Sequence, residues 1–285
     1  MRRTTHLGIL AACWLAFATA APDAAAQGKT KGKVTATKID AAKIKAELES
    51  GNEKRMLAAL QQVEDAEDAG KAAAPHLEAL ARRGASVPVL SRCLEVLGGL
   101  KQPTSSLAIA PYYRHRVPEV RRSAAKALLK TGGPAAVKAL RAALRSPDAQ
   151  VRGIAASGLG SLNAREALPD LFAALSHNVG EAAASIGQLC KPEECEKLAG
   201  YLGKLPFDVV TSGFDQILFR SPKDMGDEQK IRIVGRLREL GTKDAGNYLA
   251  DVAERWPKDW SKRVKQAVDA AVKALGGATA SPEDE

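Results

Sequence analysis

A 31-residue spacing of apolar residues limits what this chain can fold into. Two series keep this spacing, Val89, Val120, Val151 and Leu97, Leu128, Leu159. Two more run in the same register, Ile109, Leu140, Leu171 and Tyr113, Leu144, Leu175. A fixed period of this length is typical of a solenoid, in which each unit buries its apolar face only by packing on its neighbours. The sequence therefore predicts a stack of similar units.

Each unit divides into two helices. In the central unit, Pro134 suits a first helical turn, and the sequence Ser146-Pro147-Asp148 ends that helix. Asp148 can cap the helix that follows. Aromatic residues make up only 4% of the chain, so Ala, Leu and Val must fill the core, and Ala and Leu favour helices. We expect an all-α fold, a right-handed α-solenoid of antiparallel helix pairs.

The segment from Ser146 to Gly160 carries a more specific pattern, SPDAQVRGIAASGLG. Asp148 lies in the turn, Val151 and Arg152 begin the second helix, and an Ala pair and Leu159-Gly160 follow. This pattern resembles the HEAT-like repeat named after phycocyanobilin lyases. The resemblance implies a HEAT-like or ARM-like superhelix.

The neighbouring units keep this pattern only in part. One unit upstream, Val117 replaces the acid of the turn, while Arg121 and Leu128 match Arg152 and Leu159. The resemblance implies that Arg121 and Arg152 pair with acids of their own or neighbouring turns. We expect these arginines to be architectural rather than to bind a ligand.

The composition divides the chain into six expected segments. They are a signal peptide (1–26), a flexible linker (27–37), an N-terminal helix pair acting as a cap (38–74), HEAT-like repeats (75–221), a C-terminal helical cap (222–276) and a disordered acidic tail (277–285).

The first segment has the three parts of a secretory signal peptide. Arg2 and Arg3 supply the positive charge, residues 7–21 are mostly apolar, and small residues allow cleavage after Ala20 or Ala26. We therefore expect an exported protein, periplasmic or extracellular.

Lipidation at Cys13 is the alternative, because Leu10-Ala11-Ala12-Cys13 resembles a lipobox. The apolar run continues past Cys13, however, so cleavage there would fall inside the apolar region. The sequence favours the signal peptide over the lipoprotein.

The second helices line the concave face in HEAT-like proteins, so their outward positions are the expected binding surface. These positions are Ser91, Glu95, Arg122, Lys126, Gly153, Ser157, Glu181 and Ser185. Their small and mixed side chains predict a protein partner of unknown identity. Nucleic acid is not expected, since it would need repeated Lys or Arg with aromatic platforms.

Basic residues gather elsewhere in the chain, which has a net charge of +9. One set is Lys138, Arg141 and Arg145, and another is Lys230, Arg232, Arg236 and Arg238. Helical spacing explains both as solvated faces of amphipathic helices. A weak contact with anionic membrane or glycan is the alternative. We expect a monomer.

Cys190 and Cys195 flank the short sequence Lys191-Pro192-Glu193-Glu194. An oxidising compartment would allow a disulfide, which is worth about 2 kcal/mol for so short a loop. Two buried free thiols are the alternative, which the sequence slightly favours.

No residue pattern in the sequence indicates catalysis, a metal or a cofactor. The histidines are scattered, and no zinc pattern or nucleophile elbow occurs. The lyase activity of some relatives is not carried over, because a shared fold does not imply a shared site. The sequence predicts a non-catalytic interaction scaffold in the periplasm or cell envelope. The alternatives are an enzyme subunit or ligand-binding protein that uses the groove, and a basic surface protein that docks on anionic lipid or glycan.

Overall fold

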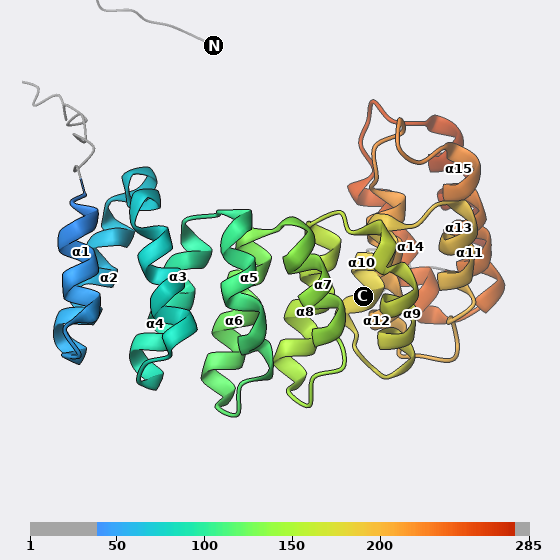
Figure 1. Cartoon of the computed structure of the whole chain (residues 1–285). Coiled ribbons are helices and arrows are strands. Elements are labelled where there is room, and N and C mark those ends of the chain that lie inside the picture. Colours follow the sequence, from blue (N-terminus) through green and yellow to red (C-terminus); the bar gives the residue numbers. More distant parts are fainter. Residues whose placement is uncertain (1–38, 277–285) are drawn as a thin grey trace, which may run out of the picture. The chain divides into compact units, whose positions relative to one another are not determined.

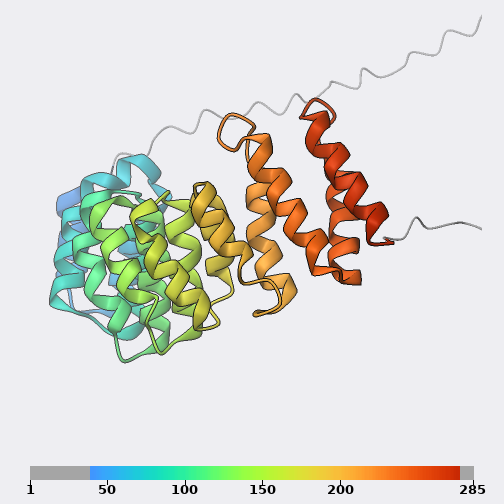
Figure 2. The ribbon, with the colours of Figure 1, turned by 90° about the vertical axis from the view of Figure 1, so that its right-hand side faces the viewer.

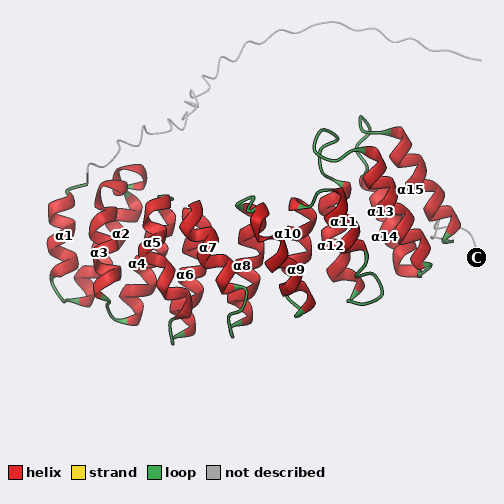
Figure 3. Cartoon of the chain, turned by 45° about the vertical axis from the view of Figure 1, so that its right-hand side comes forward, coloured by secondary structure: helices red, strands yellow, loops and turns green. Residues whose placement is uncertain are grey.

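The computed structural model describes residues 39–276. The expected signal peptide, the linker, Cys13 and the acidic tail lie outside this range. Within it the chain is all-α, and no strand occurs among the described residues (Figure 3).

Six helix pairs follow one another along the chain (Figure 1). The first helices of the pairs are α1 (Ala41–Glu49), α3 (Ala74–Arg83), α5 (Ser106–Ile109), α7 (Gly133–Ala143), α9 (Leu168–Ser176) and α11 (Pro192–Ala199). The second helices are α2 (Glu53–Asp65), α4 (Val87–Gly99), α6 (Pro118–Thr131), α8 (Ala149–Ser161), α10 (Glu181–Leu189) and α12 (Phe207–Leu218). Short 3-10 segments are η1 (Glu67–Ala73), η2 (Pro103–Ser105), η3 (Ala110–Arg114) and η4 (Arg165–Ala167).

Three further helices complete the described chain, namely α13 (Asp227–Leu240), α14 (Lys243–Arg255) and α15 (Lys262–Ala274). They form a group beyond α12, drawn in orange and red in Figure 2. Each of the three packs against the other two, and α13 also contacts α11 and α12. The fold is an α-solenoid, as the repeat pattern predicts.

The apolar series of the sequence form the core. Every member of the four 31-residue series is at least 91% buried, and most are completely inaccessible to solvent. Burying one such Leu side chain contributes roughly 1.5 to 3 kcal/mol relative to an exposed one. Packing of these series therefore decides how the units stack.

A matched pair of arginines holds the turns between the helices of two units. Arg121 donates from Nη1 to the carbonyl oxygens of His115 (3.0 Å) and Arg116 (2.9 Å). One unit later, Arg152 donates from Nη1 to the carbonyl oxygens of Ser146 (2.9 Å) and Pro147 (3.2 Å). The architectural role expected of the arginines is thus chiefly to satisfy turn carbonyls.

Asp148 links two units through its carboxylate. Its Oδ2 accepts hydrogen bonds from Arg121 (3.2 Å) and Arg122 (3.0 Å) of the preceding unit, while Oδ1 caps α8 at the amides of Gln150 and Val151. Burial acts to raise the pKa of Asp148, but the hydrogen bonds from Arg122 and the α8 amides lower it overall. Arg121 thus pairs with an acid as expected, whereas no described carboxylate pairs with Arg152. The side-chain cap of α6 is missing, because the apolar side chain of Val117 cannot accept a hydrogen bond from the first amides of the helix.

The second helices approach one another through glycines. A Cβ added at Gly98 of α4 would lie 2.8 Å from Ala127 Cα of α6, and one at Gly187 of α10 would lie 2.1 Å from the carbonyl oxygen of Gly213 in α12. The first helices α7 and α9, both fully described, are not closely packed against each other. The tighter spacing puts the second helices on the shorter, concave side of the stack.

The first helix of the 103–133 unit is shorter than the repeat predicts. It breaks into η2, α5 and η3, and Pro111 lies at the start of η3. Proline has no N–H to donate and its ring clashes with the carbonyl four residues earlier, so an α-helix cannot run through it.

Lys230 departs from the expected solvated face, because the structure buries it to 1% exposure. Its Nζ donates to the carbonyl oxygen of Arg220 (2.6 Å) and lies 4.4 Å from the ring centre of Trp260 and 5.4 Å from that of Trp256. Burial lowers the pKa of Lys230 to about 8, an effect that Asp227 opposes and Arg220 reinforces. The lysine therefore links α13 to the loop that precedes it and to the connection between α14 and α15.

The contact of α10 with α12 can be tested with two alanine substitutions. Gly187→Ala should destabilise the fold by at least about 1 to 3 kcal/mol, because the new Cβ meets backbone that cannot rotate away. Gly235→Ala in α13 is the matched control, since nothing lies within 4 Å of its Cβ position. That change should stabilise the fold by about 0.5 to 1 kcal/mol. Urea denaturation measures the free energy of unfolding of both variants. Equal changes in the two variants would contradict the close approach of α10 and α12.

Lys230 should give the stability a specific pH dependence. Between about pH 8 and the ordinary lysine pKa near 10.4, the unfolded chain holds a proton that the folded chain has lost. The free energy of unfolding should therefore rise with pH across this window, on the order of 2 kcal/mol more in the natural chain than in Lys230→Met. Denaturation curves at pH 7.5, 9 and 10.5 test this, and parallel profiles for the two proteins would disprove it.

Candidate functional site

A polar groove crosses the second-helix layer over α8, α10 and α12. Its volume is about 450 Å³. The lining residues are Ser157, Ser161, Gly180, Glu181, Ala184, Ser185, Gln188, Asp208, Val209, Ser212 and Gln216. The groove belongs to the concave side, where the sequence places the binding surface.

Two glycines of α8 make room for polar side chains of α10. A Cβ at Gly153 would lie 2.4 Å from Glu181 Oε1, and a Cβ at Gly160 would lie 2.5 Å from Ser185 Oγ. Ser185 Oγ donates to the carbonyl oxygen of Ala156 (2.8 Å). These contacts bring the Glu181 carboxylate against α8 while leaving the residue itself exposed.

The expected binding surface is only partly accessible. Glu95, Lys126, Ser157 and Glu181 are exposed and Arg122 is half-buried, whereas Ser91, Gly153 and Ser185 are buried. The prediction that Ser91, Gly153 and Ser185 face outward is therefore wrong. The helices that carry these three residues, α4, α8 and α10, each pack on a second helix at both flanks, so only a narrow stripe of their outer faces reaches solvent.

The groove unites Ser157, Glu181 and Ser185 from the expected surface but not the upstream members. The sequence does not mark the lining residues of α12 as part of a binding surface. Of these residues, Asp208 and Gln216 are exposed. The 31-residue register ends before this helix, so no repeat signal marks them. Only the packing of α10 on α12 brings them to the groove.

The lining of the groove favours ligands that offer hydrogen-bond donors. Hydroxyls and amides can both donate and accept, and Glu181 and Asp208 add two carboxylates. No basic side chain lies among the lining residues, whereas Gly180 and Ala184 leave space for close approach of a backbone. Proton transfer by a carboxylate is the chemistry that these groups can supply.

A disulfide joins Cys190 and Cys195 at the end of α10. The structure thus decides between the bridge and the two free thiols in favour of the bridge, whereas Cys93 is free and buried. Burial raises the pKa of the Cys93 thiol to about 12, which keeps it protonated and unreactive.

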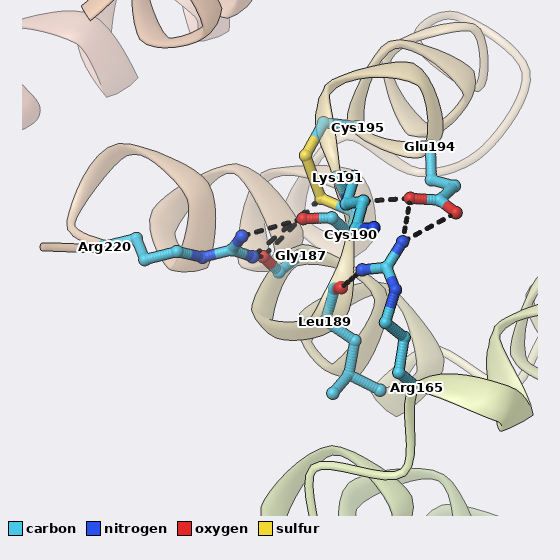
Figure 4. The surroundings of a disulfide bond; sticks show 8 residues. All are labelled: Arg165, Gly187, Leu189, Cys190, Lys191, Glu194, Cys195 and Arg220. Carbon is cyan, nitrogen blue, oxygen red and sulfur yellow. Dashed lines mark hydrogen bonds and ion pairs between the residues drawn. A yellow bond between two sulfur atoms is a disulfide. The ribbon is translucent and has the colours of Figure 1, made fainter. Parts of the chain in front are cut away.

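Two arginines clamp the turn of the disulfide from opposite sides (Figure 4). Arg220 donates to the carbonyl oxygens of Cys190 (2.7 Å) and Gly187. Arg165 donates to the carbonyl oxygen of Leu189 and pairs with both carboxylate oxygens of Glu194, at 2.9 and 2.8 Å. This clamp fixes the end of α10 and, with it, one end of the groove.

Residues 39–276 contain neither a metal site nor a helix that could span a membrane. No group of three or more His, Cys, Asp or Glu residues is placed to hold a metal ion. None of the helices there has the length and apolar character that crossing a bilayer requires.

Comparisons with known proteins agree with the repeat architecture. The family model for HEAT repeats matches residues 74–152 and 137–214. Phycocyanobilin lyase subunit alpha from Picosynechococcus sp. is 46% identical over 77 residues, which cover 26% of this chain and 29% of that protein. The chain thus matches less than a third of that relative's length.

Solved structures resemble the chain at the level of the fold. The complex of CpcE and CpcF of phycocyanin lyase from Nostoc sp. has a TM-score of 0.46 at 17% identity, covering 83% of this chain and 95% of that one. A designed armadillo repeat protein has a TM-score of 0.41 at 15% identity, covering 83% and 100%.

The prediction that the chain is not an enzyme is wrong, because the relative that is 46% identical to part of it is a lyase subunit. Groups supplied by different helices of a solenoid have no fixed spacing in the sequence, so local motifs do not reveal a site built from them. The chain is a helical-repeat scaffold similar in part to a lyase subunit. By its repeats, its helix pairs and the match of the family model, it is a HEAT-like repeat protein.

Proposed function

We propose that this chain is a subunit of a lyase-related enzyme and binds a protein partner along the groove of α8, α10 and α12. One observation carries the proposal, the 46% identity over 77 residues to a protein named as a lyase subunit. A subunit acts with other chains, so the proposal includes a protein partner whose identity is open.

The groove is suited to a polypeptide partner. Its hydroxyl and amide groups can pair with backbone N–H and C=O groups, and its small residues admit a backbone closely. The clamp on the disulfide turn holds α10 in place beside it, so the groove is formed before the partner binds. A preformed surface binds with less loss of conformational entropy.

Glu181 and Asp208 are the groups we assign to proton transfer. A lyase makes or breaks a bond without hydrolysis, and such a reaction commonly needs a proton moved at the reacting atom. The two carboxylates are the titratable side chains among the residues that line the groove. They come from α10 and from the first turn of α12, so the reaction would take place between these helices.

Export to the periplasm or cell surface belongs to the same proposal. The signal-like sequence of residues 1–26 supports it, and so does the disulfide between Cys190 and Cys195. Disulfides persist in oxidising compartments and are rare in the cytosol.

Photo-crosslinking in the native host tests the partner surface. A photoreactive residue at Gln188, which is exposed in the groove, should trap one discrete protein. The same residue at Lys138, exposed on α7 in the first-helix layer, is the matched control and should not trap it.

The purified complex then tests the reaction, with phycocyanobilin as the first probe. Glu181→Gln and Asp208→Asn should each lower turnover about 100-fold or more, the usual worth of a proton-transfer group. Glu193→Gln, which alters an exposed carboxylate outside the groove, should leave turnover unchanged. Identical crosslinks from Gln188 and Lys138 would refute the partner surface. Full turnover by both groove variants would refute the role of the two carboxylates.

The disulfide can be tested on its own. Replacing Cys190 and Cys195 together by Ser should lower the free energy of unfolding by about 2 kcal/mol, because the bridge closes a loop with a sequence separation of 5. Reduction of the natural protein should cause the same loss. Mass spectrometry after alkylation should find both cysteines protected in protein isolated from the host. Alkylation of both under non-reducing conditions would contradict the bridge and weaken the proposal of export.

A further inference from the structure

A second cavity opens in the first-helix layer, away from the groove. Its volume is about 370 Å³, within the range of small-molecule sites. The lining residues are Arg141, Leu144, Arg145, Arg152, Asp170, Ala173, Ala174 and His177. It lies where α7 and α9 are not closely packed, with Arg152 of α8 contributing between them.

The cavity carries an excess of positive charge. Three guanidinium groups face a single carboxylate, that of Asp170. Asp170 accepts from Arg141 Nε at 2.7 Å, and its other oxygen lies 3.6 Å from Arg145 Nη2. One carboxylate therefore orients two arginines and neutralises only one of the three charges, which leaves a net charge of about +2.

Several donors of this cluster remain available. Each guanidinium has five N–H donors. Arg152 uses Nη1 on the carbonyl oxygens of Ser146 and Pro147 and pairs with no described carboxylate. The Arg145 side chain is 80% exposed and makes only the long contact with Asp170. His177 Nδ1 lies 2.8 Å from the carbonyl oxygen of Ala173, which directs the other ring nitrogen away from its own helix.

The rest of the lining is apolar. Leu144, Ala173 and Ala174 form part of the wall, so the cavity combines a cationic side with a hydrocarbon side. Arginine pairs with carboxylate and phosphate in a bidentate geometry. A ligand that fits both sides carries a doubly charged anionic group on a small apolar body.

We infer that this cavity is a binding site for a small organic dianion, held by Arg145 and Arg152 through its anionic group and by Leu144 and the two alanines through its apolar body. Arg141 and Asp170 join the facing sides of α7 and α9 through a hydrogen bond that an asparagine at position 170 could also accept, while the negative charge of Asp170 competes with the ligand for the arginines. The site is independent of the proposed lyase function, since it shares no lining residue with the groove.

Phenyl phosphate is the probe that tests this inference, used at pH 8, where its phosphate is doubly charged because the second pKa lies near 6. Isothermal titration calorimetry with the full-length protein should show saturable binding at one site. Inorganic phosphate should bind at least about 10-fold more weakly because it lacks the apolar body. Benzyl alcohol, which lacks the charge, should also bind at least about 10-fold more weakly. Absence of saturable binding, or equal binding of inorganic phosphate, would overturn the inference.

Three variants separate a built site from general attraction to a basic protein. Arg145→Ala should weaken binding at least about 10-fold. Lys138→Ala removes the same charge from an exposed position on α7, outside the cavity, and should change binding less than about 2-fold. Asp170→Asn should tighten binding, because it removes the anion that competes for Arg141 and Arg145.

Circular dichroism melting checks that each variant is folded. Equal weakening by Arg145→Ala and Lys138→Ala would overturn the inference. So would weaker binding by a folded Asp170→Asn variant.

Discussion

The close approach of the second helices is the constraint on which the rest of this structure depends. Gly187 of α10 and Gly213 of α12 meet backbone to backbone, and Gly98 of α4 does the same with Ala127 of α6. Such contacts leave no volume for a side chain, so they set the distance between successive units. The apolar series then fill the space between the two layers at that distance.

Close spacing on one side forces wider spacing on the other. The second helices leave a shallow groove lined by polar side chains, whereas α7 and α9 diverge enough to open a cavity with three arginines. The two hollows lie on opposite layers and differ in charge because different residues line them. The carboxylates of Glu181 and Asp208 face one side, and Arg145 and Arg152 face the other.

Four arginine side chains bind the turns and helix ends of the solenoid. Arg121 and Arg152 satisfy turn carbonyls one unit apart, and Arg165 and Arg220 do the same around the disulfide. A hydrogen bond that involves a charged group typically contributes about 1.5 to 3 kcal/mol. These bonds also affect geometry, because turns that are held in place keep each helix pair in register with the next.

The sequence by itself determined the all-α solenoid and the apolar series of its core, because a 31-residue period records which side chains repeat the same contact. It did not determine which outward residues reach solvent. Ser91 and Ser185 are buried, and so is Lys230, because exposure depends on the helices at each flank and on loops far away in the sequence. The groove on α12 and the arginine cavity were decided by tertiary structure alone. Their residues come from helices whose separation depends on packing, and no periodicity of a single helix encodes that distance.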